Sequence, residues 1–298
     1  MLLPSDPSFR VTVRDLTKSY GDSLVLDHVS LDLESGCPCC LMAPSGAGKT
    51  TLFRILMGLE TADSGTIEGL EGRSFSAVFQ EDRLLEGYTA LQNIRFVTGR
   101  GYPAHELTAI IKHLLPEDSL KKPVSEFSGG MKQRIVIAIA LACEPKLILA
   151  DEPTTALDVT IQAQMLGLIN ELQKRLNTAM ILITHDLGVV AQTCEKVMVM
   201  YAGEAIEYGT AEDIFETTQR HPYTQGLFNA IPKLDENTKR LEAIEGMMAD
   251  PTQKIEGCRF ADRCKYATAA CKKAQKMREV TPGHFIRCCR FDPPQSNT

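Results

Sequence analysis

The spacing of apolar residues changes along the chain, and each change predicts a different kind of element. The segments RVTVRDLTKSY and LVLDHVSLDLESG alternate apolar and polar positions, which predicts a strand-rich lobe over residues 10–40. A short apolar run at 39–43 predicts a buried strand, and helical spacing in 50–59 predicts a helix directly after it. Further apolar runs at 146–150 and 179–183 predict two more strands. Strands that alternate with helices in this way indicate an α/β fold.

Two regions differ from this α/β pattern. Residues 84–142 predict a short helical subdomain, and the polar stretch DENTKRLEAIEGMMADPTQKIEG predicts a connector or loop. We therefore expect a large α/β domain, residues 1–235, that includes an antiparallel β lobe and the helical subdomain. A small, irregular, cysteine-containing C-terminal extension, residues 236–298, is expected to follow it.

Composition and charge narrow the function classes. The chain is 44% hydrophobic and 23% charged, which fits an ordinary globular protein. Its formal net charge of -6 argues against sequence-independent binding to DNA or RNA. No secretory signal is recognisable in MLLPSDPSFR, and the longest apolar run, IVIAIALAC, is about half a membrane span. We therefore expect any membrane role to depend on a partner.

The stretch LMAPSGAGKT lies between a predicted strand and a predicted helix. It matches the phosphate-loop pattern G-x-x-x-x-G-K-[ST], except that Ala43 replaces the first glycine. Backbone N–H groups of such a loop, at a helix N-terminus, point at phosphate oxygens. In this pattern Lys49 reaches the β- and γ-phosphates and Thr50 ligates Mg²⁺. Because Gly46 and Gly48 remain in the turn and alanine adds only one methyl group, we expect the loop to bind nucleotide.

Three later segments carry the residues for hydrolysis. The run KLILADEPTTALD ends a predicted strand with Asp151, which suits Mg²⁺, and Glu152, which suits a base that orients the attacking water. In EFSGGMKQR, Ser128 precedes a helical run and is predicted to cap that helix, which forms a second anion site. The run AMILITHDL leads from a predicted strand to His185, which we expect to reach the γ-phosphate.

In this order the segments resemble the ATPase subunit of an ABC transporter, whose fold is a P-loop ABC ATPase core. The resemblance implies that ATP is bound by the phosphate loop and by an aromatic residue that stacks on adenine: Tyr20, Ser45, Gly46, Ala47, Gly48, Lys49, Thr50 and Thr51. It implies catalytic roles for Lys49, Gln80, Glu152 and His185, and Mg²⁺ ligation by Thr50, Gln80 and Asp151. A signature and a D-loop that act on the partner's nucleotide match Ser128, Gly129, Gly130 and Asp158.

The resemblance also implies partners. Two cassettes close head to tail, so the chain is expected to pair with itself or with a second ABC ATPase. Two transmembrane permease subunits and, indirectly, an extracytoplasmic solute-binding protein complete such a system. The expected location is peripheral, at the cytoplasmic face of the inner membrane, and no nucleic-acid partner is expected.

The last third of the chain indicates a branch of this family. The segments TTALDVTIQAQMLGLINELQ and QRHPYTQGLFNAIPKLD resemble ATPases of the peptide and nickel importers, which carry a His-Pro-Tyr segment and a C-terminal extension. Five of the ten cysteines lie in this extension. The resemblance and the thiolate donors suit a [4Fe–4S] cluster on Cys258, Cys264, Cys271 and Cys288, with zinc or ordinary reduced thiols as the alternatives.

Three alternatives to a peptide or nickel importer remain open on sequence alone. The first is the ATPase of another small-solute importer, since the intervals from Lys49 to Gln80 and from Gln80 to Ser128 are compact. The second is an ABC ATPase that acts on ribosomes or DNA without transport, although the chain has one cassette and no heptad run. The third is a regulatory, redox-sensing ATPase. Association with two membrane proteins discriminates the importers from the other two.

Overall fold

The computed structural model describes residues 9–79, 81–99, 111–112, 114–154, 159–230, 244–249, 253 and 255–292. The chain divides into two compact units that interleave along the sequence. The first comprises Met1–Val11, Asp32–Pro38 and Glu68–Thr184, and the second comprises Thr12–Leu31, Cys39–Ile67 and His185–Thr298.

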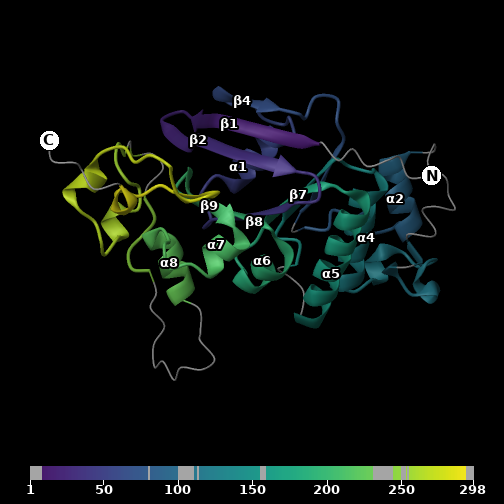
Figure 1. Ribbon diagram of the computed structural model, residues 1–298. Helices are drawn as coiled ribbons and strands as arrows, with labels where there is room; N and C mark the ends of the chain where they lie inside the picture. The colour runs from purple at the N-terminus through teal and green to yellow at the C-terminus, as the bar shows by residue number, and fades with distance from the viewer. Residues whose placement is uncertain are drawn as a thin grey trace, which may run out of the picture. The chain divides into compact units, whose positions relative to one another are not determined.

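The first unit combines a parallel sheet with helices (Figure 1). Its strands are β5 (Phe75–Val78), β6 (Leu147–Asp151) and β7 (Ala179–Ile183), with β6 between the other two and parallel to both. Its helices are α2 (Ala90–Thr98), α4 (Gly129–Ala142) and α5 (Val159–Leu176), with short 3-10 turns at Glu117–Ser119 and Val124–Glu126. The predicted helical subdomain is confirmed by α2 and α4, which share one apolar cluster that includes Ile94, Val124 and Ile135.

The second unit contains two series of β-strands. One sheet has the order β2-β1-β4, formed by β1 (Arg10–Tyr20), β2 (Ser23–Glu34) and β4 (Ser64–Glu68). The two strands predicted within residues 10–40 are therefore confirmed. A second series runs β10-β11-β9-β8-β3, formed by β3 (Pro38–Met42), β8 (Lys196–Tyr201), β9 (Glu204–Thr210), β10 (Arg278–Thr281) and β11 (His284–Ile286). In it β3 and β8 are parallel and the other pairs are antiparallel.

The helices of the second unit are α1 (Lys49–Leu56), α6 (Leu187–Thr193), α7 (Ala211–Phe215) and α8 (Pro222–Asn229). Short 3-10 turns lie at Ala261–Arg263, Ala269–Lys272 and Cys289–Phe291. The prediction of an irregular C-terminal extension is wrong for its two strands, because β11 pairs with β9 and β10 pairs with β11. The extension is thus anchored by backbone hydrogen bonds to the strands of the α/β domain.

No helix in the described parts of the chain has the length and apolar character needed to cross a bilayer.

Candidate nucleotide-binding site

The phosphate loop connects β3 to α1 within the second unit. All five residues of β3 are buried, and α1 begins immediately after Gly48. Gly46 has φ +80 and Gly48 has φ +92, values that side-chain-bearing residues rarely adopt. A Cβ on Gly48 would lie 2.7 Å from the carbonyl oxygen of Val25 and 2.7 Å from Leu26 Cδ2. Both conformation and space therefore require glycine at this position.

Lys49 is held inside the loop by the loop's own backbone. Its Nζ donates to the carbonyl oxygens of Ala43 at 2.8 Å and Pro44 at 2.9 Å. The Ala47 amide donates to the Pro44 carbonyl at 3.3 Å. Ser45, Gly46 and Thr50 are exposed, Lys49 and Thr51 are half-buried, and Ala47 is fully buried. The loop thus presents an ammonium group, a hydroxyl group and a helix N-terminus together, a combination that binds phosphate.

Ala43, the departure from the phosphate-loop pattern, has an ordinary backbone conformation. The non-glycine residues with positive φ in the described chain are Asp15, His28, Arg83, Glu144, Glu152, Asn177 and Ala202. Because Ala43 is outside this group, its methyl group requires no left-handed backbone. This supports the expectation that the loop accommodates alanine.

Tyr20, the residue expected to stack on adenine, ends β1 and is 45% exposed. Lys18, two residues earlier in β1, places its Nζ 5.3 Å from the centre of the Tyr20 ring. Lys18 also pairs with Glu60 at 3.3 Å and with Asp63 at 3.2 Å. Tyr20 is thus accessible at the surface, as stacking requires.

The acidic pair lies at the C-terminal end of β6 in the first unit. Asp151 is the last residue of β6 and stands opposite Ile183 of β7. The Glu152 amide donates to the Ile183 carbonyl at 3.0 Å, and Glu152 has φ +46. A glutamate in the left-handed region is strained, and such strain is typical of sites where the backbone aims a functional side chain.

His185 is the first residue of the last segment of the second unit, and it is exposed. The next residue, Asp186, caps α6 by accepting hydrogen bonds from the amides of Gly188 at 2.9 Å and Val189 at 3.3 Å. The cap fixes the backbone on which His185 sits. Within the second unit the chain therefore carries the phosphate loop, Tyr20 and His185, whereas Asp151 and Glu152 belong to the first unit.

The signature segment lies in the first unit, at the start of α4. Ser128 Oγ accepts from the Met131 amide at 3.4 Å, which confirms the predicted N-cap. Gly129 and Gly130 form the first turn, and a Cβ on Gly130 would lie 2.8 Å from Ile161 Cγ2. The signature glycine therefore allows α4 and α5 to approach closely.

Gln133 is a further residue of the signature helix that sequence reasoning missed. It is 6% exposed, and its Nε2 donates to the Pro153 carbonyl at 2.7 Å. Through this bond α4 supports the backbone directly after Glu152. The sequence carries no signal for it, since Gln133 lies between the charged residues Lys132 and Arg134.

Two predicted site residues, Gln80 and Asp158, lie outside the described residues.

The cysteine tail, which we define as residues 255–292, gathers five thiols. Cys271 and Cys289 have their Sγ atoms 3.7 Å apart, and the Thr268 amide donates to Cys271 Sγ at 3.4 Å. Burial raises the pKa of Cys258 to about 12 and the pKa of Cys289 to about 11, with neighbouring thiols adding to both shifts. No cysteine of the described chain is in a disulfide, and in that same part no three His, Cys, Asp or Glu side chains are placed to hold a metal ion.

The His-Pro-Tyr segment joins the α/β domain to the tail. The His221 amide donates to Glu207 Oε2 at 2.9 Å, and Glu207 Oε1 lies 2.9 Å from His284 Nε2 on β11. All three side chains are almost completely buried, and burial lowers the pKa of His221 to about 3. Tyr223 packs against Tyr201 of β8, with ring centres 4.8 Å apart, and against Phe260 of the tail at 5.5 Å.

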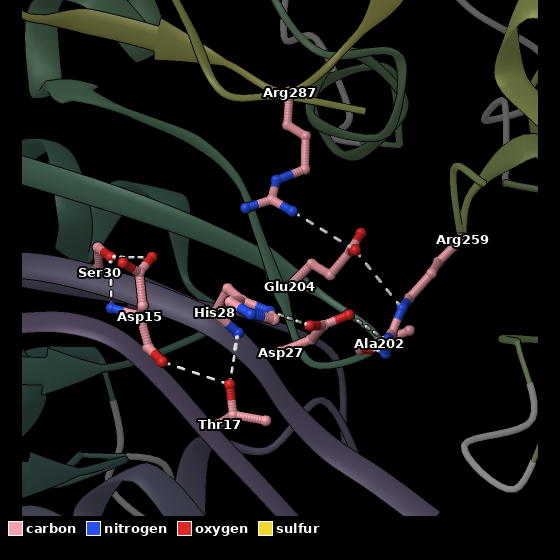
Figure 2. Close-up of polar contacts among 9 residues, drawn as sticks. All are labelled: Asp15, Thr17, Asp27, His28, Ser30, Ala202, Glu204, Arg259 and Arg287. Atoms are coloured by element: carbon pink, nitrogen blue, oxygen red, sulfur yellow. Dashed lines mark hydrogen bonds and ion pairs between the residues drawn. The ribbon is translucent and has the colours of Figure 1, made fainter. Parts of the chain in front are cut away.

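A second polar network fixes the tail to the strands (Figure 2). Arg259 binds the Ala202 carbonyl and pairs with Asp27 of β2 at 2.6 Å. Glu204 lies 3.7 Å from Arg259 and 3.5 Å from Arg287. Burial raises the pKa of Glu204, although the two guanidinium groups oppose that shift. Side chains about 230 residues apart thus meet in one place.

Comparison with known proteins agrees with this geometry. The sequence model of the ABC transporter family matches residues 26–155, and that of the oligopeptide/dipeptide transporter C-terminal region matches residues 206–271.

Curated relatives match over most of their length. The oligopeptide transport ATP-binding protein OppD of Haemophilus influenzae is 40% identical over 88% of this chain and 90% of the relative. OppD of Escherichia coli is 37% identical over 93% of this chain and 92% of the relative. The dipeptide transport ATP-binding protein DppD of Lactococcus lactis is 37% identical over 92% of this chain and 87% of the relative.

A solved structure, cbiO1 of Clostridium perfringens, is described as part of the ABC transporter complex cbiONQ. It is 28% identical, has a TM-score of 0.63, and the match covers 70% of this chain and 91% of that one. The ATP-binding subunit of another ABC transporter matches with a TM-score of 0.61 at 28% identity, over 68% and 91% of the two chains. The chain therefore belongs to the ABC transporter family, in the branch of the oligopeptide and dipeptide transport ATP-binding proteins.

Proposed function

We propose that this chain is the ATP-hydrolysing, energy-coupling subunit of an ABC importer for dipeptides or oligopeptides. The observation that carries the proposal is the union, in one chain, of the ABC transporter region and the oligopeptide/dipeptide C-terminal region. The curated relatives described above are named for peptides, which favours peptides over nickel and over other small solutes.

The residues of the phosphate loop bind the phosphates of ATP in this proposal. We assign Lys49, whose ammonium group is held inside the loop by the Ala43 and Pro44 carbonyls, to neutralise the β- and γ-phosphates. Thr50 and Asp151 hold Mg²⁺, which supplies charge neutralisation when bound, with Gln80 as a further contact. Tyr20 stacks on adenine.

Hydrolysis then depends mainly on positioning. We assign Glu152, whose backbone has a positive φ, to orient the attacking water, and His185 to sense the γ-phosphate. Ser128, Gly129, Gly130 and Asp158 act on the nucleotide of the second cassette. Closure of two cassettes completes the site, so a single chain hydrolyses slowly.

An exposed apolar surface of the first unit supports a membrane partner. Leu85, Tyr88, Phe96 and Val97 are between 37% and 75% exposed, within and directly before α2. Aromatic and aliphatic side chains gathered at a surface are typical of a protein interface. We propose that this surface contacts one of the two permease subunits, which sets the chain at the cytoplasmic face of the membrane, with the solute-binding protein acting through the permease.

We also propose that the tail holds a [4Fe–4S] cluster on Cys258, Cys264, Cys271 and Cys288. Four soft sulfur donors suit such a cluster. Burial raises the pKa of Cys258 and of Cys288, although backbone amides of Phe260 and Arg290 that donate to the two thiols oppose this shift. These four cysteines would hold the cluster, whereas no three His, Cys, Asp or Glu side chains in the described part of the chain are placed to hold a single metal ion. Iron and sulfide assays on anaerobically purified protein test this, and substoichiometric iron would contradict it.

The experiment that tests the transport role is affinity purification of tagged Glu152→Gln protein from detergent-solubilised membranes with ATP. This substitution keeps nucleotide bound and slows hydrolysis, so it should trap the closed complex. We expect two polytopic membrane proteins, together with a second cassette or another copy of the chain. Lys49→Ala is the matched control, because it should lose both nucleotide and the closed complex. Recovery of only ribosomal or other soluble partners from the Glu152→Gln sample would overturn transport.

A further inference from the structure

Two separate series of contacts connect the cysteine tail to the phosphate loop. Each of these routes begins at an arginine of the segment CRFADRC. Arg259 and Arg263 are four residues apart in this segment and both are partly buried. Every residue in the two routes belongs to the second unit. Neither arginine has a role in the chemistry described above.

The first route begins at Arg259, as Figure 2 shows. Its guanidinium group binds Asp27 at 2.6 Å and the Ala202 carbonyl, and the Asp27 amide donates to the Gly203 carbonyl at 2.9 Å. The two residues before Asp27 are Val25 and Leu26, which close the space beside Gly48 of the phosphate loop. Arg259 therefore fixes the strand against which the last turn of the loop packs.

The second route begins at Arg263. Its Nε donates to the Glu245 carbonyl at 2.8 Å and its Nη2 to the Ile244 carbonyl at 2.9 Å, while Nη1 donates to Tyr201 Oη at 3.2 Å. Ile244 also packs against α8, since a Cβ on Gly226 would lie 2.8 Å from Ile244 Cγ1. One charged side chain thus holds the segment 244–249 by its backbone.

The segment 244–249 in turn reaches the phosphate loop. Met248 is half-buried, and its Cε lies 3.2 Å from the position of a Cβ on Gly46. The contact is with the face of Gly46 that would carry a side chain, whereas phosphate is bound by backbone N–H groups. Met248 therefore supports the loop without occupying its anion-binding groups.

We propose that Arg259 and Arg263 are positioning residues for the nucleotide site, and that Met248 is the support through which Arg263 acts on the phosphate loop. The proposal rests on the proposed ATPase function and adds the C-terminal extension to its nucleotide site. The extension then sets the affinity for the phosphates of ATP, and the rate of the chemical step at saturating ATP is independent of it.

The test is steady-state ATP hydrolysis by the full-length protein with its partners, with KM and kcat measured separately. Met248→Ala should raise the KM for ATP about fivefold or more with kcat unchanged, because only ground-state binding of nucleotide loses its support. Met248→Leu, which refills the space beside Gly46, should restore a KM near that of the unsubstituted protein. Met247→Ala is the matched control, since Met247 is 91% exposed.

Variants of the two arginines test the two routes. Arg259→Ala should raise the KM for ATP, because the strand beside Gly48 loses its anchor. Arg263→Ala should raise KM as Met248→Ala does, and the double variant should add little, since both act through one contact. Arg290→Ala, which removes an exposed tail arginine stacked on Tyr266 at 3.9 Å, should leave KM unchanged. If Arg263→Ala fails to fold, the Met248 series alone still decides the matter.

The outcomes separate the two proposals. No Lys49-dependent ATP binding by the unsubstituted protein would contradict the ATPase function. Lys49-dependent binding with an unchanged or lowered KM in Met248→Ala would overturn the support role. If the segment 244–249 strengthens ATP binding, ATP must in turn stabilise this segment. Saturating ATP should therefore slow amide hydrogen exchange in 244–249, and this protection should be lost in Arg263→Ala.

Discussion

The phosphate loop and the cysteine tail are ordered by different means. The loop is shaped by its own residues: two glycines with positive φ and a lysine that binds carbonyls five and six residues before it. The tail depends on distant partners, since Arg259 and His284 bind residues 232 and 77 positions earlier. Local sterics decide the first structure, and buried polar contacts across the chain decide the second.

This difference predicts how each region fails. A substitution in the loop should directly change ATP binding or strain the backbone at the substituted residue. A change in the tail network should first loosen the extension, because a buried charged group left without its partner is strongly destabilising. The four predictions that follow test this difference, from the largest expected effect to the smallest.

The largest effect is expected on the rate of ATP hydrolysis, which should depend on the single residue Glu152. Glu152→Gln should lower ATP turnover about 10²- to 10⁴-fold while ATP stays bound, because the amide no longer accepts a proton from water. Phosphate release and nucleotide affinity, measured on the same preparation, check this. Glu144→Gln is the control, since Glu144 also has positive φ and is exposed. Equal losses in both variants would remove the catalytic assignment.

Backbone sterics in the loop can be separated into two contributions. Gly48→Ala should reduce the free energy of unfolding by about 1–3 kcal/mol and abolish ATP binding, because alanine meets Val25 and a left-handed backbone together. Gly58 also has positive φ, but a Cβ there would have no neighbour within 4 Å. Gly58→Ala should therefore show the conformational penalty alone in urea unfolding. Full ATP binding by Gly48→Ala would refute the steric account.

The network that holds the tail should make stability depend on pH. Burial depresses the pKa of His221 to about 3 from an ordinary 6.5, so the unfolded chain binds a proton that the folded chain excludes. Stability from this residue is present above pH 6.5 and is lost as pH falls toward about 3, at about 1.4 kcal/mol per pH unit.

Urea unfolding between pH 7 and pH 4 checks this dependence. His221→Asn keeps an acceptor at the helix cap and should flatten the slope, whereas His28→Asn, at an exposed histidine, should not. A slope equally steep in His221→Asn would show that other groups cause it.

The smallest effect is expected where the loop departs from its pattern. Ala43→Gly should change ATP affinity less than about twofold and stability by less than about 1 kcal/mol, because Ala43 already has an ordinary backbone conformation. Isothermal titration with ATP measures the first and thermal unfolding the second. A large gain in affinity would mean that the methyl group obstructs the phosphate site.

What the sequence predicted follows the same division between local and distant contacts. The strands in residues 10–40, the strand–loop–helix around Lys49 and the cap at Ser128 are local, and the structure confirms all three. Glu207, Arg259 and Met248 could not be assigned from sequence, since their partners are identified only once the chain has folded. The left-handed backbone of Glu152 was equally hidden, because the motif gives the residue type and not its φ.

The pairing of β11 with β9 bears on how the protein stays dispersed in solution. Without the tail, the seven-residue β9 would present its unpaired N–H and C=O groups to other chains, and such edges promote aggregation. With the tail, the outermost strand of that series is β10, which has four residues and an irregular register between Glu279 and Thr281. A short, irregular border strand is a poor template for further strands. Removal of the extension should therefore yield a protein that precipitates, whatever its nucleotide site retains.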